Sequence, residues 1–577
     1  MNYANGIQTT GMAALPAWRS RLLFLLLLAG LAALMVRSAY LQGIHNDFLQ
    51  QKGDARYGRI ISINAHRGMI TDRNGEPLAI STPVESVWAS PRDARVTPGQ
   101  IRQLARLLQL EERELKGRLF DASRDFSYLR RQLPPETAAA VIKLGVPGIF
   151  LQREYRRYYP AGEVTAQTLG FTDLDDNGQE GIELAFQAQL AGKAGSERVI
   201  KDRRGHIVED VASIRAPKPG SDVALSLDNR IQYHAYREIK QAVLRHRAKA
   251  GSIVVLDAKS GELLALANWP SFNPNNRDKP RQEVLRNRAI TDLFEPGSTI
   301  KPFTVAAALE AGRIRQGSQI STDGGVLSIS GWKIRDTHPE KVLTAAGILQ
   351  KSSNVGAAKI GLMMTPETFW RSLVEAGFGT QTGSLFPGEA TGKLRDYKKW
   401  RPIEQATISY GNGISVNLLQ MARAYTVFAN DGVLKPVTLL RQDAPVEGVK
   451  IYSDTTSQAI LHMLELVTKP GGTAPLAQIA GYRVAGKTGT AHKLDNGRYV
   501  DRYVSSFIGV APASNPRLVV AVMVDDPAGD SYYGGEVAAP AFSAVMGHSL
   551  HVLGIPNDAP SDNVVLPPAL PLIREDA

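Results

Sequence analysis

The chain has 577 residues, and its 43% hydrophobic and 21% charged residues are ordinary proportions for a globular protein of more than one domain. Its formal net charge of +11 is spread along the chain rather than gathered in one arm, so no nucleic-acid-binding function is predicted. Because the chain contains no cysteine, thiol nucleophiles, thiolate metal sites, iron–sulfur clusters and disulfides are excluded, and any catalytic nucleophile must be an oxygen or an amine.

The N-terminal segment is typical of a membrane anchor. Arg19 and Arg21 precede an unbroken apolar run over residues 22–36. Continued to residue 41, this run is about long enough to cross a bilayer, so we predict a cytoplasmic tail over 1–21 and a transmembrane anchor over 22–41. The basic residues on the N-terminal side place the rest of the chain outside the cytoplasm. A cleaved signal peptide is the alternative interpretation.

The exported part divides at a cluster of helix- and strand-breaking residues. Residues 42–218 mix short strands with helical stretches such as 100–120, which predicts a smaller α+β module. Pro217 and Pro219 then interrupt the chain, and we expect a second, larger domain to begin there.

That larger domain is predicted over residues 219–555. Its β-branched runs predict buried strands, and its alanine-rich stretches predict helices, so we expect a sheet with helices around it. The strands are expected at 252–257 and 518–524, and the helices at 301–310 and 418–430. Residues 556–577 are rich in proline and lack periodicity, which predicts a flexible tail.

Two segments match the pattern S-x-x-K, which pairs a hydroxyl nucleophile with an amine base. Ser298 and Lys301 begin an apolar helical stretch, so their side chains lie on one face, and the Ser298 amide is one of the unpaired donors of a helix N-terminus. A nucleophile and half of an oxyanion hole therefore come together there. Ser330 and Lys333 lie in an alternating segment predicted to be a strand, which places them on opposite faces and excludes this copy.

Partner motifs decide whether the S-x-x-K match has chemical meaning. Ser352-Ser353-Asn354 supplies S-x-N between two helical segments, and Lys487-Thr488-Gly489 supplies K-[ST]-G further along the chain. Other matches are expected to be structural: Lys259-Ser260-Gly261 is predicted to be a hairpin turn, and Ser561-Asp562-Asn563 lies in the predicted flexible tail. The ordered set of three motifs is found in penicillin-recognising serine acyltransferases.

A competing pattern overlaps the third motif. Gly481, Gly486, Lys487 and Thr488 satisfy G-x-x-x-x-G-K-[ST], the pattern of P-loop nucleoside triphosphatases. A phosphate-binding loop requires a helix that begins at the lysine, whereas a hairpin turn at Asp495-Asn496-Gly497 is predicted instead. We keep this interpretation only as an alternative.

Beyond the three motifs, the chain resembles the class B penicillin-binding proteins, and among them the division-type, penicillin-binding protein 3-like members, over about residues 20–555. The stretches that resemble this family are Arg67-Gly68-Met69-Ile70-Thr71-Asp72-Arg73-Asn74-Gly75, Tyr158-Tyr159-Pro160-Ala161-Gly162, Gly181-Ile182-Glu183, Arg286-Asn287-Arg288, Phe294-Glu295-Pro296-Gly297 and Tyr532-Tyr533-Gly534-Gly535. Asn354 favours the division type over the elongation type. Asn412 departs from the family, which usually has an aromatic residue there. The resemblance therefore does not give the shape of the acyl-acceptor or antibiotic side of the active-site cleft.

The resemblance implies an α+β multi-domain fold with a transmembrane helix, an α+β pedestal domain of the class B dimerisation type, and a serine β-lactamase-like transpeptidase domain, an antiparallel sheet flanked by helices. It implies a peptidoglycan D,D-transpeptidase of septal cell-wall synthesis that β-lactams acylate. The enzyme would lie in the bacterial inner membrane with its catalytic domain in the periplasm, and its partners would include a membrane glycosyltransferase and division proteins. Neither metal nor cofactor is expected.

The expected mechanism begins at Ser298. Burial, the helix dipole and the charge of Lys487 would lower the pKa of Lys301, which would deprotonate Ser298 for attack on the penultimate D-Ala carbonyl. Ser352 would relay the proton to the leaving D-Ala. By resemblance, the amides of Ser298 and Thr490 would form the oxyanion hole. The substrate-binding residues would be Asn354, Lys487, Thr488, Gly489 and Thr490.

Two other functions remain open. In one, the protein is a scaffold or sensor that penicillin acylates without turnover. In the other it is a serine β-lactamase, although a long pedestal and a retained anchor are unnecessary for a secreted hydrolase. His548 and His551 share a helical face and are expected to be ordinary surface or core residues rather than a zinc pair.

Overall fold

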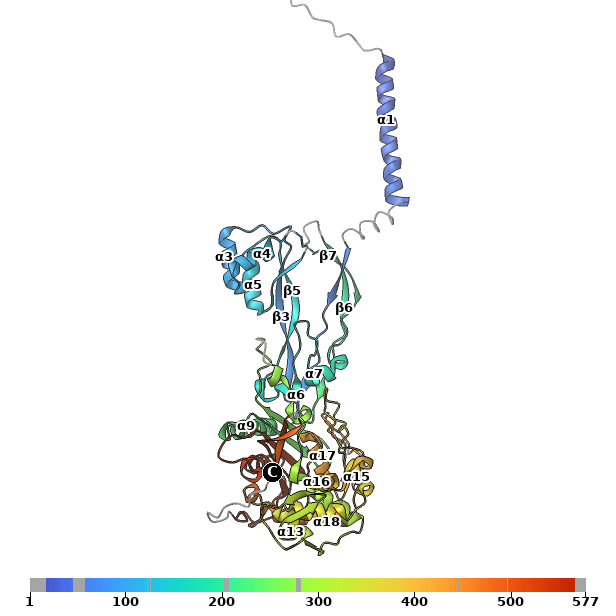
Figure 1. Ribbon diagram of the computed structural model, residues 1–577. Coiled ribbons are helices and arrows are strands. Elements are labelled where there is room, and N and C mark those ends of the chain that lie inside the picture. Colours follow the sequence, from blue (N-terminus) through green and yellow to red (C-terminus); the bar gives the residue numbers. More distant parts are fainter. Residues whose placement is uncertain are drawn as a thin grey trace, which may run out of the picture. The chain divides into compact units, whose positions relative to one another are not determined.

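The computed structural model describes residues 17–44, 58–121, 123–124, 126–201, 207–276, 282–444, 446–495 and 497–565. Its first element is the apolar helix α1 (Ala17–Ala39), which continues into the π-helical turn η1 (Tyr40–Ile44) (Figure 1). The stretch Ala17–Gln42 is long and apolar enough to cross a membrane. Arg19 and Arg21 therefore lie inside the helix, which begins before the predicted start at residue 22. Residues 1–16 of the expected cytoplasmic tail lie outside the described residues.

The chain forms two compact units, and the first comprises Met1–Asn64, Glu85–Arg153 and Ala194–Lys218. A three-stranded antiparallel sheet in the order β1-β6-β7 belongs to it, as does a group of three helices that shares an apolar core with β4. The elements are β1 (Gly58–Ile63), α3 (Pro98–Leu108), α4 (Glu112–Leu119), β4 (Ser127–Leu133), α5 (Pro135–Lys143), β6 (Gly195–Lys201) and β7 (Ile207–Arg215).

The single helical stretch expected over residues 100–120 is two helices. Gln109 adopts a left-handed conformation with φ of 52° and ends α3, and α4 begins three residues later at Glu112. The break lets both helices bury apolar faces in one core, because Leu104 and Leu108 of α3 and Leu115 of α4 are all fully buried.

The second unit comprises Ala65–Val84, Glu154–Lys193 and Pro219–Ala577. Its centre is a five-stranded antiparallel sheet whose inner strands are continuous apolar runs because both faces are covered. The strand order is β10 (Leu263–Trp269), β9 (Ala250–Asp257), β19 (Leu518–Asp525), β18 (Arg498–Ala511) and β17 (Ala485–Asp495). The strands and helices expected at 252–257, 518–524, 301–310 and 418–430 are all present.

Helices pack against this sheet in two groups. In the first, α9 and α20 contact each other, and the Phe542 ring of α20 approaches Gly509 of β18. In the second group, α17 and α18 contact the sheet and each other. Figure 1 shows the two groups apart, with α9 of the first group away from α13, α16 and α18. The longer helices are α9 (Asn229–Arg245), α12 (Lys301–Glu310), α13 (Ala345–Lys351), α14 (Asn354–Leu362), α15 (Pro366–Glu375), α16 (Pro402–Ile408), α17 (Leu418–Ala429), α18 (Asp454–Thr468) and α20 (Ala539–Val552).

Short elements complete the second unit. Three two-stranded antiparallel sheets pair β11 (Gln319–Ser321) with β14 (Val342–Thr344), β12 (Val326–Ile329) with β13 (Trp332–Arg335), and β15 (Val433–Leu434) with β16 (Val449–Lys450). The short helices are η2 (Gly162–Val164), α6 (Ala166–Leu169), α7 (Gly181–Ala185), α8 (Gln187–Leu190), α10 (Gln282–Leu285), α11 (Arg288–Thr291), η3 (Gly297–Ile300), η4 (Tyr397–Lys399), η5 (Pro475–Ala477) and α19 (Gly534–Val537). The remaining short strands of this unit are β2 (Ile70–Thr71) and β8 (Val223–Ala224). The longer strands β3 (Pro77–Ala89) and β5 (Ile149–Tyr158) each have residues in both units.

Part of the segment expected to be a separate pedestal packs with the second unit. In that part Glu183 is fully buried between two arginines: Arg67 Nε donates to its Oε2 at 2.8 Å, and Arg157 Nε donates to its Oε1 at 2.6 Å. Two cations thus share one carboxylate in the interior, which ties segments distant in sequence together. The boundaries expected at residues 218 and 555 stay predictions.

The first ten residues of the tail expected to be flexible are held by hydrogen bonds. Asn563 accepts from the Gly481 amide at 3.0 Å and donates to the Tyr482 carbonyl at 2.8 Å, and Asp558 accepts from the Arg483 amide at 2.7 Å. Residues 556–565 lack periodicity but have hydrogen-bond partners elsewhere in the chain, and the flexibility of the tail stays a prediction. Residues 566–577 lie outside the described residues.

Candidate active site

The hydroxyl of Ser298 lies at a tight turn that leads into a helix. Ser298 is part of the 3-10 helix η3, and Lys301 begins α12 directly after it. In a 3-10 helix residues three apart eclipse one another, so the two side chains share one side even though Ser298 precedes the α-helix proper. Tyr425 Oη donates to the Thr299 carbonyl at 2.7 Å and holds the turn in place.

The second motif lies at a junction of two helices. Helix α13 ends at Lys351, Ser352 adopts a left-handed conformation with φ of 60°, and Ser353 caps the start of α14. Ser352 is nearly buried, and Asn354 is half-buried at the first position of α14.

Two buried lysines converge on Ser352. Lys301 Nζ donates to the Ser352 carbonyl at 2.5 Å, to its Oγ at 3.1 Å and to Asn354 Oδ1 at 2.8 Å. Lys487 Nζ donates to the same Ser352 Oγ at 2.9 Å and to Thr488 Oγ1 at 3.1 Å. Both lysine side chains are 0% exposed. The structure therefore links all three motifs through one serine hydroxyl.

The third motif lies on an edge strand. Strand β17 is the last of the five-stranded sheet and pairs on one side with β18, where Thr488 is opposite Phe507. An edge strand has a row of backbone groups outside the ladder, which is the arrangement that accepts an added peptide strand. Thr490 Oγ1 accepts from the Gly534 amide at 3.1 Å.

Gly489 lets the edge strand approach the nucleophile turn. A Cβ added there would lie 2.5 Å from Ser506 Oγ, closer than real side chains approach, and 3.0 Å from the Pro296 carbonyl oxygen, which is a tight contact. The K-[ST]-G motif thus needs glycine for steric reasons, since Pro296 belongs to the turn that presents Ser298.

Ser298, Asn354 and Thr490 line one cleft of about 390 Å³. Ser298 is only 5% exposed, so it lies at the bottom of the cleft rather than on the surface. No aspartate or glutamate is among the described residues that line it, whereas two basic residues and a histidine are. The lining consists of Gly297, Ser298, Lys333, Ile334, Arg335, Asn354, Tyr410, Asn412, Thr490, His492, Tyr503 and Tyr532.

Asn412, the residue that departs from the family pattern, lines this cleft on a loop that packs against the nucleophile turn. Gly411 has φ of 101°, and a Cβ there would lie 2.0 Å from the Gly297 carbonyl oxygen. Behind the loop, Glu295 accepts from the Gly413 amide at 2.8 Å and from Tyr499 Oη at 3.0 Å. Burial raises the pKa of the Glu295 carboxyl above its ordinary value.

Two residues that hold the site were not predicted from the sequence. Asp336 accepts from Ser353 Oγ at 2.6 Å, from the Asn354 amide at 2.6 Å and from the Val355 amide at 2.9 Å, so one carboxylate binds the start of α14. Thr473 Oγ1 lies 2.8 Å from Thr488 Oγ1 and orients the third motif. The only sequence signal for Asp336 is an acidic residue directly after a predicted strand, which is too common to single it out.

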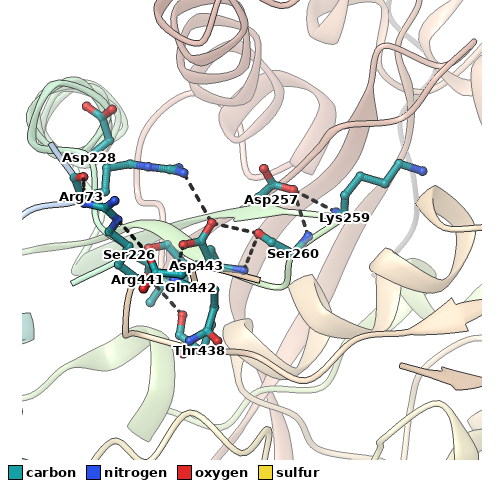
Figure 2. Close-up of polar contacts among 12 residues, drawn as sticks. Arg73, Ser226, Asp228, Asp257, Lys259, Ser260, Thr438, Arg441, Gln442 and Asp443 are labelled. Atoms are coloured by element: carbon teal, nitrogen blue, oxygen red, sulfur yellow. Dashed lines mark hydrogen bonds and ion pairs between the residues drawn. The ribbon is translucent and has the colours of Figure 1, made fainter. Parts of the chain in front are cut away.

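The other motif matches have structural roles. Figure 2 shows Lys259 and Ser260 in a turn whose backbone amides donate to Asp257 at 2.9 and 3.2 Å, as a hairpin turn predicts. Ser330, with φ of 47°, lies in the turn between β12 and β13, not within one strand as predicted, and this still separates it from Lys333.

The P-loop interpretation is wrong. Lys487 and Thr488 lie inside β17, which pairs residue by residue with β18, and no helix begins there. A phosphate-binding loop needs free backbone amides followed by a helix N-terminus. Within the described ranges, no group of three histidine, aspartate or glutamate side chains could hold a metal ion.

Comparisons with known proteins match this geometry. Residues 251–547 match the family described as penicillin binding protein transpeptidase domain, and residues 62–225 match the penicillin-binding protein dimerisation domain. The chain is 44% identical over 529 residues to a probable peptidoglycan D,D-transpeptidase, PenA, of Neisseria gonorrhoeae, with 91% of each protein covered. It is 42% identical over 550 residues to the peptidoglycan D,D-transpeptidase FtsI of Escherichia coli strain K12, covering 94% of this chain and 93% of that protein.

A solved structure is similar as well. The transpeptidase domain of penicillin-binding protein 3 from Burkholderia pseudomallei is 44% identical, with a TM-score of 0.54, and the match covers 58% of this chain and 98% of that one.

Proposed function

This chain belongs to the penicillin-binding protein transpeptidases and cross-links peptidoglycan stem peptides, and from that premise we propose that Ser298 is its nucleophile. The observation that supports this assignment is the convergence of Lys301 and Lys487 on Ser352 Oγ, at 3.1 and 2.9 Å. Lys301 also donates to Asn354, which lines the same cleft as Ser298. A septal role fits its relatives of the FtsI type.

Lys301 is the base of the proposed mechanism. Two ammonium groups within hydrogen-bond distance of one hydroxyl repel each other, so a state with both lysines charged is disfavoured. Lys301, the lysine on the nucleophile's own turn, would take the Ser298 proton as the hydroxyl attacks the penultimate D-Ala carbonyl. Ser352, which contacts both amines, would pass that proton to the departing D-Ala.

The remaining residues would bind the donor peptide. The backbone amides of Ser298 and Thr490 would hold the developing oxyanion, a contribution for which losing one donor typically costs about 10²–10³ in rate. The peptide would lie along the free edge of β17, with its terminal carboxylate at Lys487, Thr488 and Thr490 and one amide at Asn354. A stem-peptide amine would then resolve the acyl-enzyme into a cross-link.

The apolar helix α1 and the relatives fit a single-pass inner-membrane protein. We place the catalytic domain in the periplasm because Arg19 and Arg21 precede the apolar run. A membrane glycosyltransferase and division proteins are the proposed partners of α1 and the first unit. Because the chain lacks cysteine, one cysteine at the exposed position Leu385 would be a unique label for a membrane-impermeant maleimide. Labelling in intact spheroplasts is the expected result, and labelling only after lysis would contradict the orientation.

The test of the nucleophile is the intact mass of the full-length chain in detergent after incubation with a penicillin. We expect one stable drug adduct on the wild type, none on Ser298→Ala, and an unchanged adduct on Ser330→Ala, the matched control from the other S-x-x-K. An adduct that survives Ser298→Ala would refute the assignment.

Turnover separates the other functions. With a D-Ala-D-Ala stem peptide and an amine acceptor, the proposal predicts release of D-Ala together with a cross-linked product. A dead acyl-enzyme after a single burst would instead indicate a sensor, and rapid hydrolysis of penicillin would indicate a β-lactamase.

A further inference from the structure

Strand β13 brings two cations to the wall of the active-site cleft. Lys333 and Arg335 occupy alternate positions of the strand, so their side chains leave the same face, and both line the cleft with Ser298. Ile334 between them is buried in an apolar cluster with Val355, and it also borders the cleft. Strand β13 therefore carries two exposed cations with a buried apolar residue between them.

The strand is tied directly to the catalytic motifs. Asn354 Nδ2 donates to the Arg335 carbonyl at 3.3 Å, and the Asp336 carboxylate binds the next backbone amides of α14. The backbone of this strand is therefore held beside Asn354, and the exposed side chains of both cations start from there.

Neither cation is neutralised nearby. Among the described residues, no ion pair involves Lys333 or Arg335, and no described residue lining the cleft is acidic. By contrast, Lys487 is already engaged with Ser352 and Thr488, where the terminal carboxylate of the donor is expected. A pair of unpaired cations on a fixed strand beside a nucleophile is suited to a second anion.

We propose that Lys333 and Arg335 form a subsite for a second carboxylate of the stem peptide, the one carried by its diamino acid. This inference rests on the proposed function and names its substrate: a stem whose diamino residue keeps a free carboxylate instead of an amide or hydrogen. The subsite contributes through charge and through the bidentate donor geometry of arginine.

The experiment uses the full-length chain in detergent and two stem pentapeptides ending in D-Ala-D-Ala, identical except for a carboxylate or a carboxamide at the diamino residue. The measured quantity is kcat/KM for D-Ala release. We expect the wild type to prefer the carboxylate peptide by about 10-fold, the sum of two partly exposed ion pairs. Lys333→Ala/Arg335→Ala should bring the preference to within about twofold, and Lys341→Ala, an exposed lysine outside the cleft lining, should leave it intact.

Ionic strength gives an independent readout, because a screened charge contact weakens with salt whereas a packing contact does not. The preference of the wild type should fall as salt rises from about 0.05 to 0.5 M, and the double variant should show no such trend. A wild type that treats both peptides alike, or a preference that survives in the double variant, would overturn the subsite.

Acylation by penicillin distinguishes a failure of the carboxylate subsite from a failure of the proposed function. Penicillin has a single carboxylate, so the double variant should be acylated at the wild-type rate. Normal acylation with no peptide preference would remove the subsite alone, whereas absence of acylation in the wild type would remove both.

Discussion

Asp336 determines where the second motif lies, and replacing it is the sharpest test of the site's architecture. Its carboxylate accepts three hydrogen bonds, from Ser353 Oγ and from the Asn354 and Val355 amides, at 2.6 to 2.9 Å. Asp336→Ala removes all three and leaves two amide donors at the start of α14 without that acceptor. Asp336→Asn keeps one oxygen for the two amides and loses the charge and the acceptor for Ser353 Oγ.

The expected magnitude follows from these contacts. A hydrogen bond to a charged group contributes roughly 1.5–3 kcal/mol, and because Asp336 is half-buried we take the lower end, which gives about 3 kcal/mol for the two amides. The loss would let the turn at Ser352 move, and a displacement of about 1 Å costs on the order of 10² in rate. We expect acylation by penicillin to slow about 100-fold in Asp336→Ala and about 10-fold or less in Asp336→Asn.

The assay is the second-order rate constant for acylation by a fluorescent penicillin, measured with the melting temperature of each variant. Asp323→Ala is the matched control, since it removes another nearby carboxylate, one that pairs with Lys359 at 2.6 Å away from the cleft lining. Its rate should equal that of the wild type. The reasoning is refuted if folded Asp336→Ala is acylated within about threefold of the wild-type rate.

Three further predictions concern stability and the nucleophile turn. Glu183→Gln leaves the buried Arg67 and Arg157 without their shared charge and should lower the unfolding free energy by about 3–5 kcal/mol in urea titrations; a loss under about 1 kcal/mol would contradict this. Burial raises the pKa of Asp176 to about 6, so its stabilising contribution is complete below the unfolded pKa and is lost as pH rises through about 6. Asp176→Asn should therefore melt higher than the wild type at pH 8 and not at pH 4, and equal differences at both pH values would show the reasoning wrong. Gly489→Ala should reduce penicillin acylation by about 100-fold or more, because the added Cβ displaces the nucleophile turn; an unchanged rate would contradict this.

The parts of the site whose residues lie close together within one helix or strand could be predicted from the sequence. Ser298 and Lys301 are three residues apart at a predicted helix start, and Lys487 lies in a strand whose partner follows after a hairpin turn. Such spacing within one element already fixes which side chains share a face. The order of the three motifs along the chain then indicates a penicillin-recognising serine acyltransferase.

Contacts between distant segments could not be predicted in this way. Asp336 binds residues 17 to 19 positions further along the chain, and nothing in its neighbours indicates that partner. The same holds for Asn563, which lies in a proline-rich segment without periodicity yet binds Gly481 and Tyr482. Periodicity reports the faces of single elements, whereas these bonds depend on which elements the fold places side by side.

The meeting of Lys301 and Lys487 at Ser352 makes the active site a reporter of folding. Ser352 is 51 residues from Lys301 and 135 residues from Lys487, so their contacts exist only after distant parts of the chain have assembled. A covalent penicillin label added for a few seconds during refolding would mark only those molecules in which the three motifs already meet. Gel densitometry of such pulses would count native molecules over time, without a spectroscopic probe and without any change to the chain.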